Sequence, residues 1–316
     1  ACEIEGYMHW ATGKSPHGLC IESMLYLAAG STQLSYAIIC SAAEPMEWYA
    51  NHYFKALARW RKMYEEYTAF NVGSRLGGVD PYISPNMVMR QSPDFGWITT
   101  SGAGDVATSI APLGIPYAPE SDAAVAYVVD APSAWGIPAQ EFEELLSAQG
   151  IVFDEASWNV IKTRQLDHLF TPVESPGELG ATTCYSGKHG GRAAVIPAFS
   201  QSISNAQRLE ILRAMDWASN HRLPVIVESM AQALVMPRVD GDGTLRSVML
   251  LNCSISEQMQ PTRLRLRGCD LNGKSKLVWH SVGDRDKVLP AEREGGDVVV
   301  DIPPLAGWYA GWLSVE

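Results

Sequence analysis

The apolar pattern of this chain changes once, at about Val235, and that change limits what the chain can fold into. Before it, short apolar runs alternate with stretches in which apolar residues recur every three or four positions, as strands and helices do. After it, strand-like runs are joined by turns rich in Gly and Asp. The sequence therefore predicts an α/β protein with parallel or mixed sheets, followed by an antiparallel β-sandwich.

The first 75 residues predict two β/α units. The expected elements are a strand over 2–7, a helix over 18–29 capped by Ser15, a strand over 33–39 and a long helix over 48–70. Two such units are too small to bury both faces of a sheet. We therefore expect this segment to be the end of a larger β/α array.

The rest of the chain divides into three further segments. Residues 76–93, rich in Gly and Pro, predict a linker. Residues 94–234 predict an open α/β sheet domain, and 235–316 predict the β-sandwich. In the α/β segment we expect strands at 95–100, 123–129, 151–153, 193–196 and 224–227, and helices at 104–113, 139–148, 154–163 and 205–219. In the last segment we expect strands at 245–252, 262–267, 277–280, 298–302 and 308–315.

Charge and length exclude several classes of partner. The formal net charge is -11 and the pI is about 5.1, whereas nucleic acids and anionic membranes bind basic surfaces. No apolar run approaches the roughly 20 residues that a bilayer-spanning helix needs. We therefore expect a soluble protein with no nucleic-acid or membrane partner. The acidic charge does not exclude neutral substrates.

Cysteine and histidine spacing predicts no metal site. The six cysteines are widely spread and contain no C-x-x-C, so buried free thiols are favoured over a disulfide framework. His9 and His17 lack a third partner at ligand spacing. We expect neither a metal nor a cofactor.

The opening strand carries the main candidate site. In Cys2–Tyr7, alternation places Glu3 and Glu5 on one face and Ile4 on the other. The two carboxylates are either a solvated chain start or catalytic groups in a polar cleft. Tyr7, His9 and Trp10 follow directly, and rings beside carboxylates suit a sugar, although such residues also pack in cores.

One loop fits a dinucleotide-binding motif and predicts a different function. Gly102–Ala107 fits G-x-G-x-x-G/A, and Asp130 ends the next predicted strand. Asp105, however, would place a carboxylate where a pyrophosphate must bind, and a capped helix start explains the same residues. Gly187–Gly191 resembles a phosphate-binding loop but lacks the first Gly and the Ser or Thr after Lys, so it predicts a turn. Asp240 and Asp242 resemble calcium ligands, but the third acidic position and the distal Glu of a calcium loop are absent, so they predict a hairpin turn.

Several short strings resemble the carboxyl-terminal portion of a barrel-type glycoside hydrolase, similar in layout to the family 42 β-galactosidases. The matching strings are Glu3–Glu5 with Lys14 and Ser15, Leu27–Gly30, Gly190–Val195, Arg208, Trp217, Leu223–Val225, Leu250–Ser254 and Ile302–Trp308. The resemblance implies the last two units of a (β/α)8 barrel, a flavodoxin-like trimerisation domain and a small β-sandwich. It covers essentially the whole chain.

The resemblance also implies a role for the first strand. In such barrels the seventh strand delivers the nucleophilic glutamate, so Glu3 or Glu5 is the candidate nucleophile, with a carbohydrate as substrate. The acid/base carboxylate would lie on barrel strands that precede Ala1 or belong to a partner chain, and a homo-oligomer is expected. Any targeting segment would also precede Ala1, which leaves periplasmic or secreted location open. The alternative is a non-catalytic oligomerisation or carbohydrate-binding module.

Overall fold

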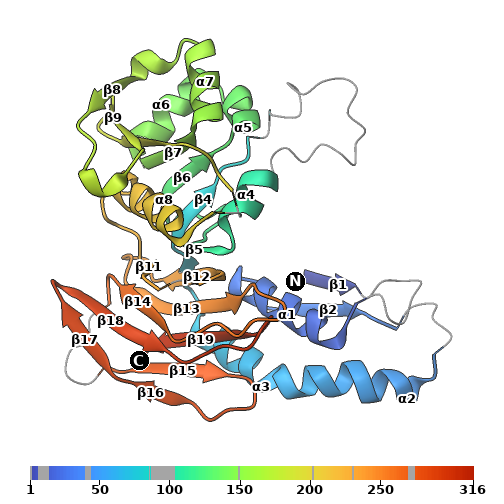
Figure 1. The fold of residues 1–316 in the computed structure, drawn as a ribbon. Coiled ribbons are helices and arrows are strands. Elements are labelled where there is room, and N and C mark those ends of the chain that lie inside the picture. Colours follow the sequence, from blue (N-terminus) through green and yellow to red (C-terminus); the bar gives the residue numbers. More distant parts are fainter. Residues whose placement is uncertain are drawn as a thin grey trace.

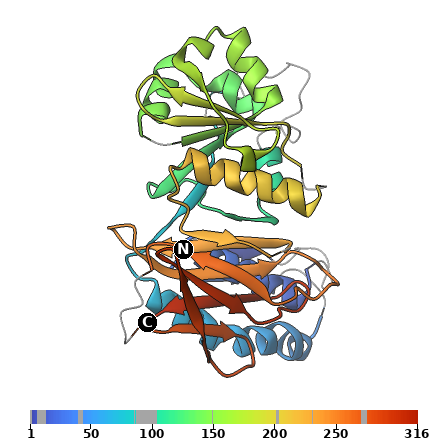
Figure 2. The same ribbon diagram turned by 60° about the vertical axis from the view of Figure 1, so that its left-hand side comes forward.

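The computed structural model describes residues 2–5, 14–39, 44–84, 86, 104–148, 150–200, 203–229, 231–269 and 275–316. These residues form sheets of two, six, four and seven strands. Figure 1 shows the six-stranded sheet and its helices above the four- and seven-stranded sheets, with the two-stranded sheet and a long helix beside them. The same stacking is seen in Figure 2. Within the described residues, no helix has the length and apolarity needed to cross a membrane.

The chain begins with a parallel strand pair joined through a helix. Strands β1 (Cys2–Glu5) and β2 (Leu34–Ala37) pair in parallel, and α1 (Pro16–Ala28) lies between them in sequence. Helix α1 begins at the predicted signal, because the Gly18 amide donates to Ser15 Oγ at 2.9 Å. The strand, helix, strand order predicted for this segment is therefore present.

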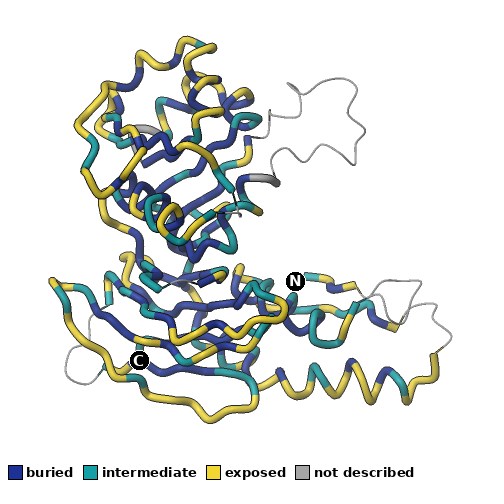
Figure 3. Tube along the Cα trace, in the orientation of Figure 1, coloured by how far each residue is buried: buried dark blue, intermediate teal, exposed yellow. Residues whose placement is uncertain are grey.

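The long helix predicted over 48–70 runs from Met46 to Phe70. It comprises α2 (Met46–Tyr49), the π-helical segment η1 (Ala50–Phe54) and α3 (Lys55–Phe70). Exposed positions alternate with a buried stripe along its length, as Figure 3 shows. The buried members are Tyr49, Tyr53, Trp60, Met63 and Tyr67. The aromatic side chains at helical spacing are thus part of the core.

The six-stranded sheet is mixed. Its order is β4 (Gly78–Pro81), β6 (Ala124–Val129), β7 (Gly150–Asp154), β10 (Arg192–Ile196), β9 (Thr183–Gly187) and β8 (Phe170–Val173). The first four strands are parallel to one another, and β9 and β8 complete the sheet in antiparallel pairing. The parallel or mixed sheet expected for this region is therefore confirmed.

Helices cover both faces of this sheet. On one face lie α4 (Gly104–Ile110) and α8 (Asn205–Ala218), which share a core with Val128 and Val152. The other face packs against α5 (Ala131–Gly136), α6 (Ala139–Ala148) and α7 (Glu155–Thr163). Alternate residues of each buried strand therefore face opposite helix layers, which explains the nearly continuous apolar runs. Two short 3-10 helices, η3 (Asp167–Leu169) and η4 (Gly177–Leu179), complete the unit.

The carboxyl-terminal strands form two facing sheets. The smaller sheet has the order β11 (Val225–Val227), β14 (Thr262–Leu266), β18 (Asp297–Ile302) and β17 (Ala291–Glu294). The larger has β16 (Lys287–Leu289), β15 (Leu277–Ser281), β19 (Ala310–Val315), β13 (Leu245–Asn252), β12 (Ala233–Val239) and β3 (Arg75–Leu76), with β5 (Leu113–Pro116) parallel to β12. One apolar cluster unites residues of both sheets, including Leu264, Val300, Val248 and Leu313.

The structure corrects two predicted segment assignments. The linker predicted over 76–93 is wrong for 78–81, because these residues form β4, which is fully buried in the six-stranded sheet. Its Gly and Pro residues resemble a turn in sequence. The strand predicted at 224–227 exists as β11, but it pairs with β14 in the β-sheet unit rather than with the α/β sheet. The strand predicted at 95–100 lies outside the described residues.

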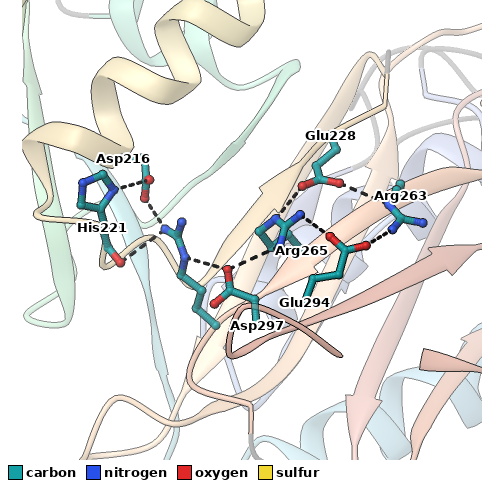
Figure 4. A network of polar contacts seen from close by, with 8 residues as sticks. Asp216, His221, Glu228, Arg263, Arg265, Glu294 and Asp297 are labelled. Carbon is teal, nitrogen blue, oxygen red and sulfur yellow. Dashed lines mark hydrogen bonds and ion pairs between the residues drawn. The ribbon is translucent and has the colours of Figure 1, made fainter. Parts of the chain in front are cut away.

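A charged network connects α8 to the smaller β-sheet (Figure 4). Arg267 pairs with Asp216 of α8 and lies 3.4 Å from Asp297 Oδ2. Arg265 donates through Nε to Glu228 Oε1 at 2.6 Å. Alternate residues of a strand share a face, so these arginines form a row between carboxylates. The other members of the network are His221, Arg263 and Glu294.

The cysteines within the described residues form no disulfide bond with one another. They are Cys2, Cys20, Cys184, Cys253 and Cys269. Burial raises the pKa of Cys20 and of Cys253 to about 11, so both remain protonated thiols at neutral pH. The predicted buried thiols are confirmed for Cys20 and Cys184, whereas Cys2, Cys253 and Cys269 are only partly buried.

Candidate functional site

The opening strand presents two carboxylates on one exposed face. Glu3 and Glu5 are both exposed, whereas Ile4 between them is 0% exposed. In the parallel register Glu3 lies opposite Ser35 and Glu5 opposite Ala37 of β2. The predicted alternation is therefore present, and the face that carries both carboxylates is open to solvent in the described structure.

The opposite face of the same strand pair is sealed by helices. Ile4 packs in a cluster with Leu19 of α1 and with Tyr49 and Tyr53 of the long helix. On β2, Tyr36 Oη lies 3.0 Å from Ser23 Oγ of α1. This packing fixes which face of β1 meets the helices, and so it fixes the direction in which Glu3 and Glu5 point.

The strand ends define where chemistry can occur. Glu5 is the last residue of β1, so it lies at the carboxyl edge that parallel strands share, while Glu3 lies about 7 Å further back along the strand. The predicted sugar-binding residues Tyr7, His9 and Trp10 lie outside the described residues. The structure therefore tests the face that carries Glu3 and Glu5 and does not test the aromatic platform.

Asp80 is a buried acid that sequence reasoning missed. It lies on β4, is 8% exposed, and its Oδ1 accepts a hydrogen bond from the Glu120 amide at 3.2 Å. Burial raises the pKa of its carboxyl to about 6 despite that hydrogen bond. Its charge in turn adds to the burial that raises the pKa values of Tyr117 and Tyr127. The turn-like string Gly-Val-Asp-Pro contains no signal that this aspartate would be buried.

A cleft of about 570 Å³ lies where the α/β unit meets the β-sheets. Its walls are the amino end of α8, the start of β5, the residues after β11, the end of β13 and the loop before β14. Apolar residues such as Leu113, Ile203 and Met259 share the lining with amide side chains. A cavity of this size with a few polar groups suits one small organic ligand.

Arg208 forms the buried floor of the cleft. It is 4% exposed, and its guanidinium donates to the carbonyl oxygens of Leu113 at 3.1 Å and Ser229 at 2.8 Å, and to Asn205 Oδ1 at 2.9 Å. These bonds join α8 to β5 and to the chain after β11. Desolvation lowers the pKa of Arg208. The residue therefore holds the walls of the cleft together.

The exposed rim of the cleft carries amides that are available to a ligand. Gln232, Gln258 and Gln260 line it and are exposed. Asn252 also lines it, but its side-chain amide donates to the carbonyl oxygens of Glu257 at 2.8 Å and of nearby residues, so it shapes the loop. Glutamine amides of this kind can donate to and accept from sugar hydroxyls.

The remaining sequence motifs are turns or lie outside the described residues. Between β12 and β13, the Gly243 amide donates to Asp240 O at 3.0 Å, which confirms the predicted hairpin turn. Between β9 and β10, the Gly190 amide donates to Gly187 O at 3.0 Å, which confirms the second turn. The proposed nucleotide loop is described only from Gly104 onward, so it stays untested.

Comparison with known proteins identifies the fold. No family model and no curated protein matches the sequence. Three solved glycoside hydrolases share its fold with a TM-score of 0.55 each. α-L-Fucosidase isoenzyme 2 from Paenibacillus thiaminolyticus is 13% identical, with 96% of this chain and 58% of that chain covered. The GH42 β-galactosidase Gan42B is 12% identical, with 95% and 51% covered. A β-galactosidase from Bacillus circulans sp. alkalophilus is 10% identical, with 96% and 52% covered.

The low sequence identities limit what this likeness shows. At these identities it shows a shared fold and assigns no activity or catalytic residue. The chain spans about half the length of these enzymes.

Proposed function

We propose that this chain is the carboxyl-terminal half of a glycoside hydrolase and that its opening strand contributes a catalytic glutamate. In this proposal β1, α1, β2 and the long helix are the last two units of a (β/α)8 barrel. The six-stranded unit is the flavodoxin-like domain, and the two facing sheets are the β-sandwich. The observation that carries the proposal is the exposed pair Glu3 and Glu5, opposite the sealed Ile4.

The geometry of β1 supports this assignment. In a β/α barrel, strand residues alternate between the helix layer and the barrel interior. Ile4 contacts the helix layer, so Glu3 and Glu5 take the orientation of interior residues. Two carboxylates facing solvent on an otherwise well-packed strand fit a polar active site that further strands would enclose.

Glu5 is the better candidate for the nucleophile. Catalytic residues of such barrels lie at the carboxyl ends of the strands, and Glu5 is the last residue of β1. A retaining enzyme needs a second carboxylate about 5 Å away as acid/base. Glu3 lies earlier on the same strand, so we assign the acid/base to preceding barrel strands or to a partner chain, and the substrate to the carbohydrates.

Covalent trapping tests this proposal. The native polypeptide that contains residues 1–316, purified from its source, is assayed with aryl glycosides of β-galactose, α-fucose and α-rhamnose. It is then treated with the matching 2-deoxy-2-fluoro glycoside, which arrests a retaining enzyme as a glycosyl ester. We expect peptide mass spectrometry to find the sugar on Glu5 and Glu5→Gln to abolish hydrolysis.

The control separates the two glutamates. Glu3→Gln removes a carboxylate from the same exposed face without touching the strand end, and we expect it to retain the covalent label on Glu5. A label on a residue outside β1, or full activity in Glu5→Gln, contradicts the assignment. Absence of hydrolysis across the whole panel contradicts the enzymatic proposal.

The cleft at Arg208 favours a second function, binding of a small neutral saccharide by a non-catalytic module. Its rim amides and apolar walls match the hydroxyls and C–H faces of a sugar. Isothermal titration with galactose, fucose and rhamnose tests this. We expect the double variant Gln232→Ala, Gln258→Ala to lose binding, while Gln140→Ala on the surface of α6 retains it. Unchanged binding in the double variant contradicts a role for the cleft.

A further inference from the structure

We infer that Glu66, His280 and Asp286 form a binding site for one divalent transition-metal ion, of which Zn²⁺ fits the ligands best. One ligand atom from each residue lies within 4.8 Å of the other two. They meet in a cavity of about 240 Å³ between α3 and the turn that follows β15. In Figure 1 this is the region where α3 reaches the β15–β16 hairpin. The inference is independent of the glycosidase proposal.

A buried nitrogen points to a ligand here. The residue His280 is 8% exposed, and its Nδ1 atom is buried without a hydrogen-bond partner among the described residues. Asp286 Oδ1 lies 3.0 Å from His280 Nδ1, which is within ion-pair distance. The two atoms nevertheless do not form a hydrogen bond, so Nδ1 stays unsatisfied. Leaving a buried polar atom unsatisfied costs free energy. A metal ion between the two atoms would satisfy both.

The second ring nitrogen of His280 has a hydrogen-bond partner, as the second nitrogen of a metal-binding histidine usually does. His280 Nε2 lies 3.0 Å from Ser314 Oγ, and the Ser314 hydroxyl donates to Glu316 Oε1 at 3.2 Å. Ser314 Oγ therefore accepts a hydrogen bond from Nε2–H, which leaves the Nδ1 lone pair facing the cavity. The ring also stacks on Trp312 with centroids 4.0 Å apart. Such a partner fixes the tautomer and orientation of a metal ligand.

The charges around the cavity favour a cation. Glu66 and Asp286 have side chains 41% and 42% exposed, so both carboxylates can rotate toward the ion. Lys62 Nζ lies 3.4 Å from Glu66 Oε1 and competes for it, but that lysine is 72% exposed and the pair is correspondingly weak. With Asp284 and Arg59 included, the lining has three acidic residues and two basic ones.

The ligand set selects the class of metal. Ca²⁺ and Mg²⁺ prefer oxygen ligands alone, whereas imidazole nitrogen together with carboxylate suits Zn²⁺. Three protein ligands and one water complete the tetrahedral shell of zinc. Tetrahedral ligands at about 2.1 Å are about 3.4 Å apart, so the exposed carboxylates must move inward on binding. The bound ion would join α3 to β15.

Titration of Zn²⁺ into metal-free, untagged protein tests the inference. Accessible thiols such as Cys2 are alkylated first, because sulfur ligands would compete for the metal. We expect calorimetry to give one ion per chain and thermal unfolding to shift upward with Zn²⁺. X-ray absorption should show one imidazole nitrogen in the coordination shell.

Isosteric variants make the result specific. Glu66→Gln and Asp286→Asn keep the shape of each side chain and are expected to weaken Zn²⁺ binding by about 10-fold or more. The matched control is Glu65→Gln, one position earlier on α3, whose carboxylate pairs with Arg61. Affinity unchanged in both ligand variants overturns the site, as does the absence of any bound ion. Tighter binding of Ca²⁺ than of Zn²⁺ overturns the assignment of His280 as a ligand.

Discussion

Asp80 Oδ1 accepts a hydrogen bond from the Glu120 amide at 3.2 Å, and that single bond does not offset the burial of the carboxyl. Burial raises its pKa to about 6, above the value of about 3.9 in an unfolded chain. The folded protein therefore binds this proton more tightly than the unfolded protein does. It follows that Asp80 makes the fold less stable as pH rises through the window from about 4 to about 6.

Replacement of Asp80 by Asn removes this titration while keeping the oxygen that accepts from Glu120. We expect Asp80→Asn to increase the free energy of unfolding by about 2 kcal/mol at pH 7.5, with the gain shrinking toward pH 4. Urea unfolding at several pH values measures it. The exposed Asp122→Asn serves as control, and a gain that is the same at every pH would contradict the argument.

Arg267 is expected to stabilise the contact between α8 and the smaller β-sheet. Its side chain is 22% exposed and that of Asp216 is 11% exposed, so the pair is less screened than a surface pair. Arg267→Gln should lower the free energy of unfolding by about 1–2 kcal/mol in urea titrations. Arg61→Gln, which breaks the exposed pair with Glu65, should leave the unfolding midpoint unchanged. Equal effects of the two variants would refute a special role for Arg267.

Gly150 allows β7 to approach the end of α8 closely. A Cβ atom at this position would lie 2.0 Å from the carbonyl oxygen of Ala218, which is backbone and cannot move aside cheaply. We expect Gly150→Ala to cost at least about 2 kcal/mol by thermal unfolding. At Gly177 an added Cβ has nothing within 4 Å, so Gly177→Ala should be tolerated. Equal stability of the two variants would show that the strand and helix are not in close contact.

Ile4 holds β1 against the helices. Ile4→Ala removes a side chain that is 0% exposed and should destabilise this region by about 2–5 kcal/mol. Hydrogen exchange of the β2 amides (Leu34–Ala37) is the appropriate measurement, since β1 pairs with that strand. Glu3→Gln changes the solvent face and should leave this exchange unaltered. Faster exchange in Glu3→Gln alone would show that the two faces have been assigned in reverse.

Local signals predicted the elements well. Ser15 predicted the start of α1, because capping depends on residues three positions apart. Strand alternation predicted that Glu3 and Glu5 share a face. The sequence predicted less well which strands pair with one another. The run at 224–227 is apolar in either sheet, and only its pairing with β14 determines to which sheet it belongs.

The sequence by itself determined many of the helices and strands, which strand residues share a face, and the acidic charge, since all of these depend on near neighbours or on composition. The tertiary structure alone decided which face of β1 is covered, that Asp80 is buried, and that Arg208 closes the floor of a cleft. It also brought Glu66 to His280 and Asp286. These outcomes depend on contacts between residues far apart in the chain, and local periodicity contains no information about which distant surface will exclude water.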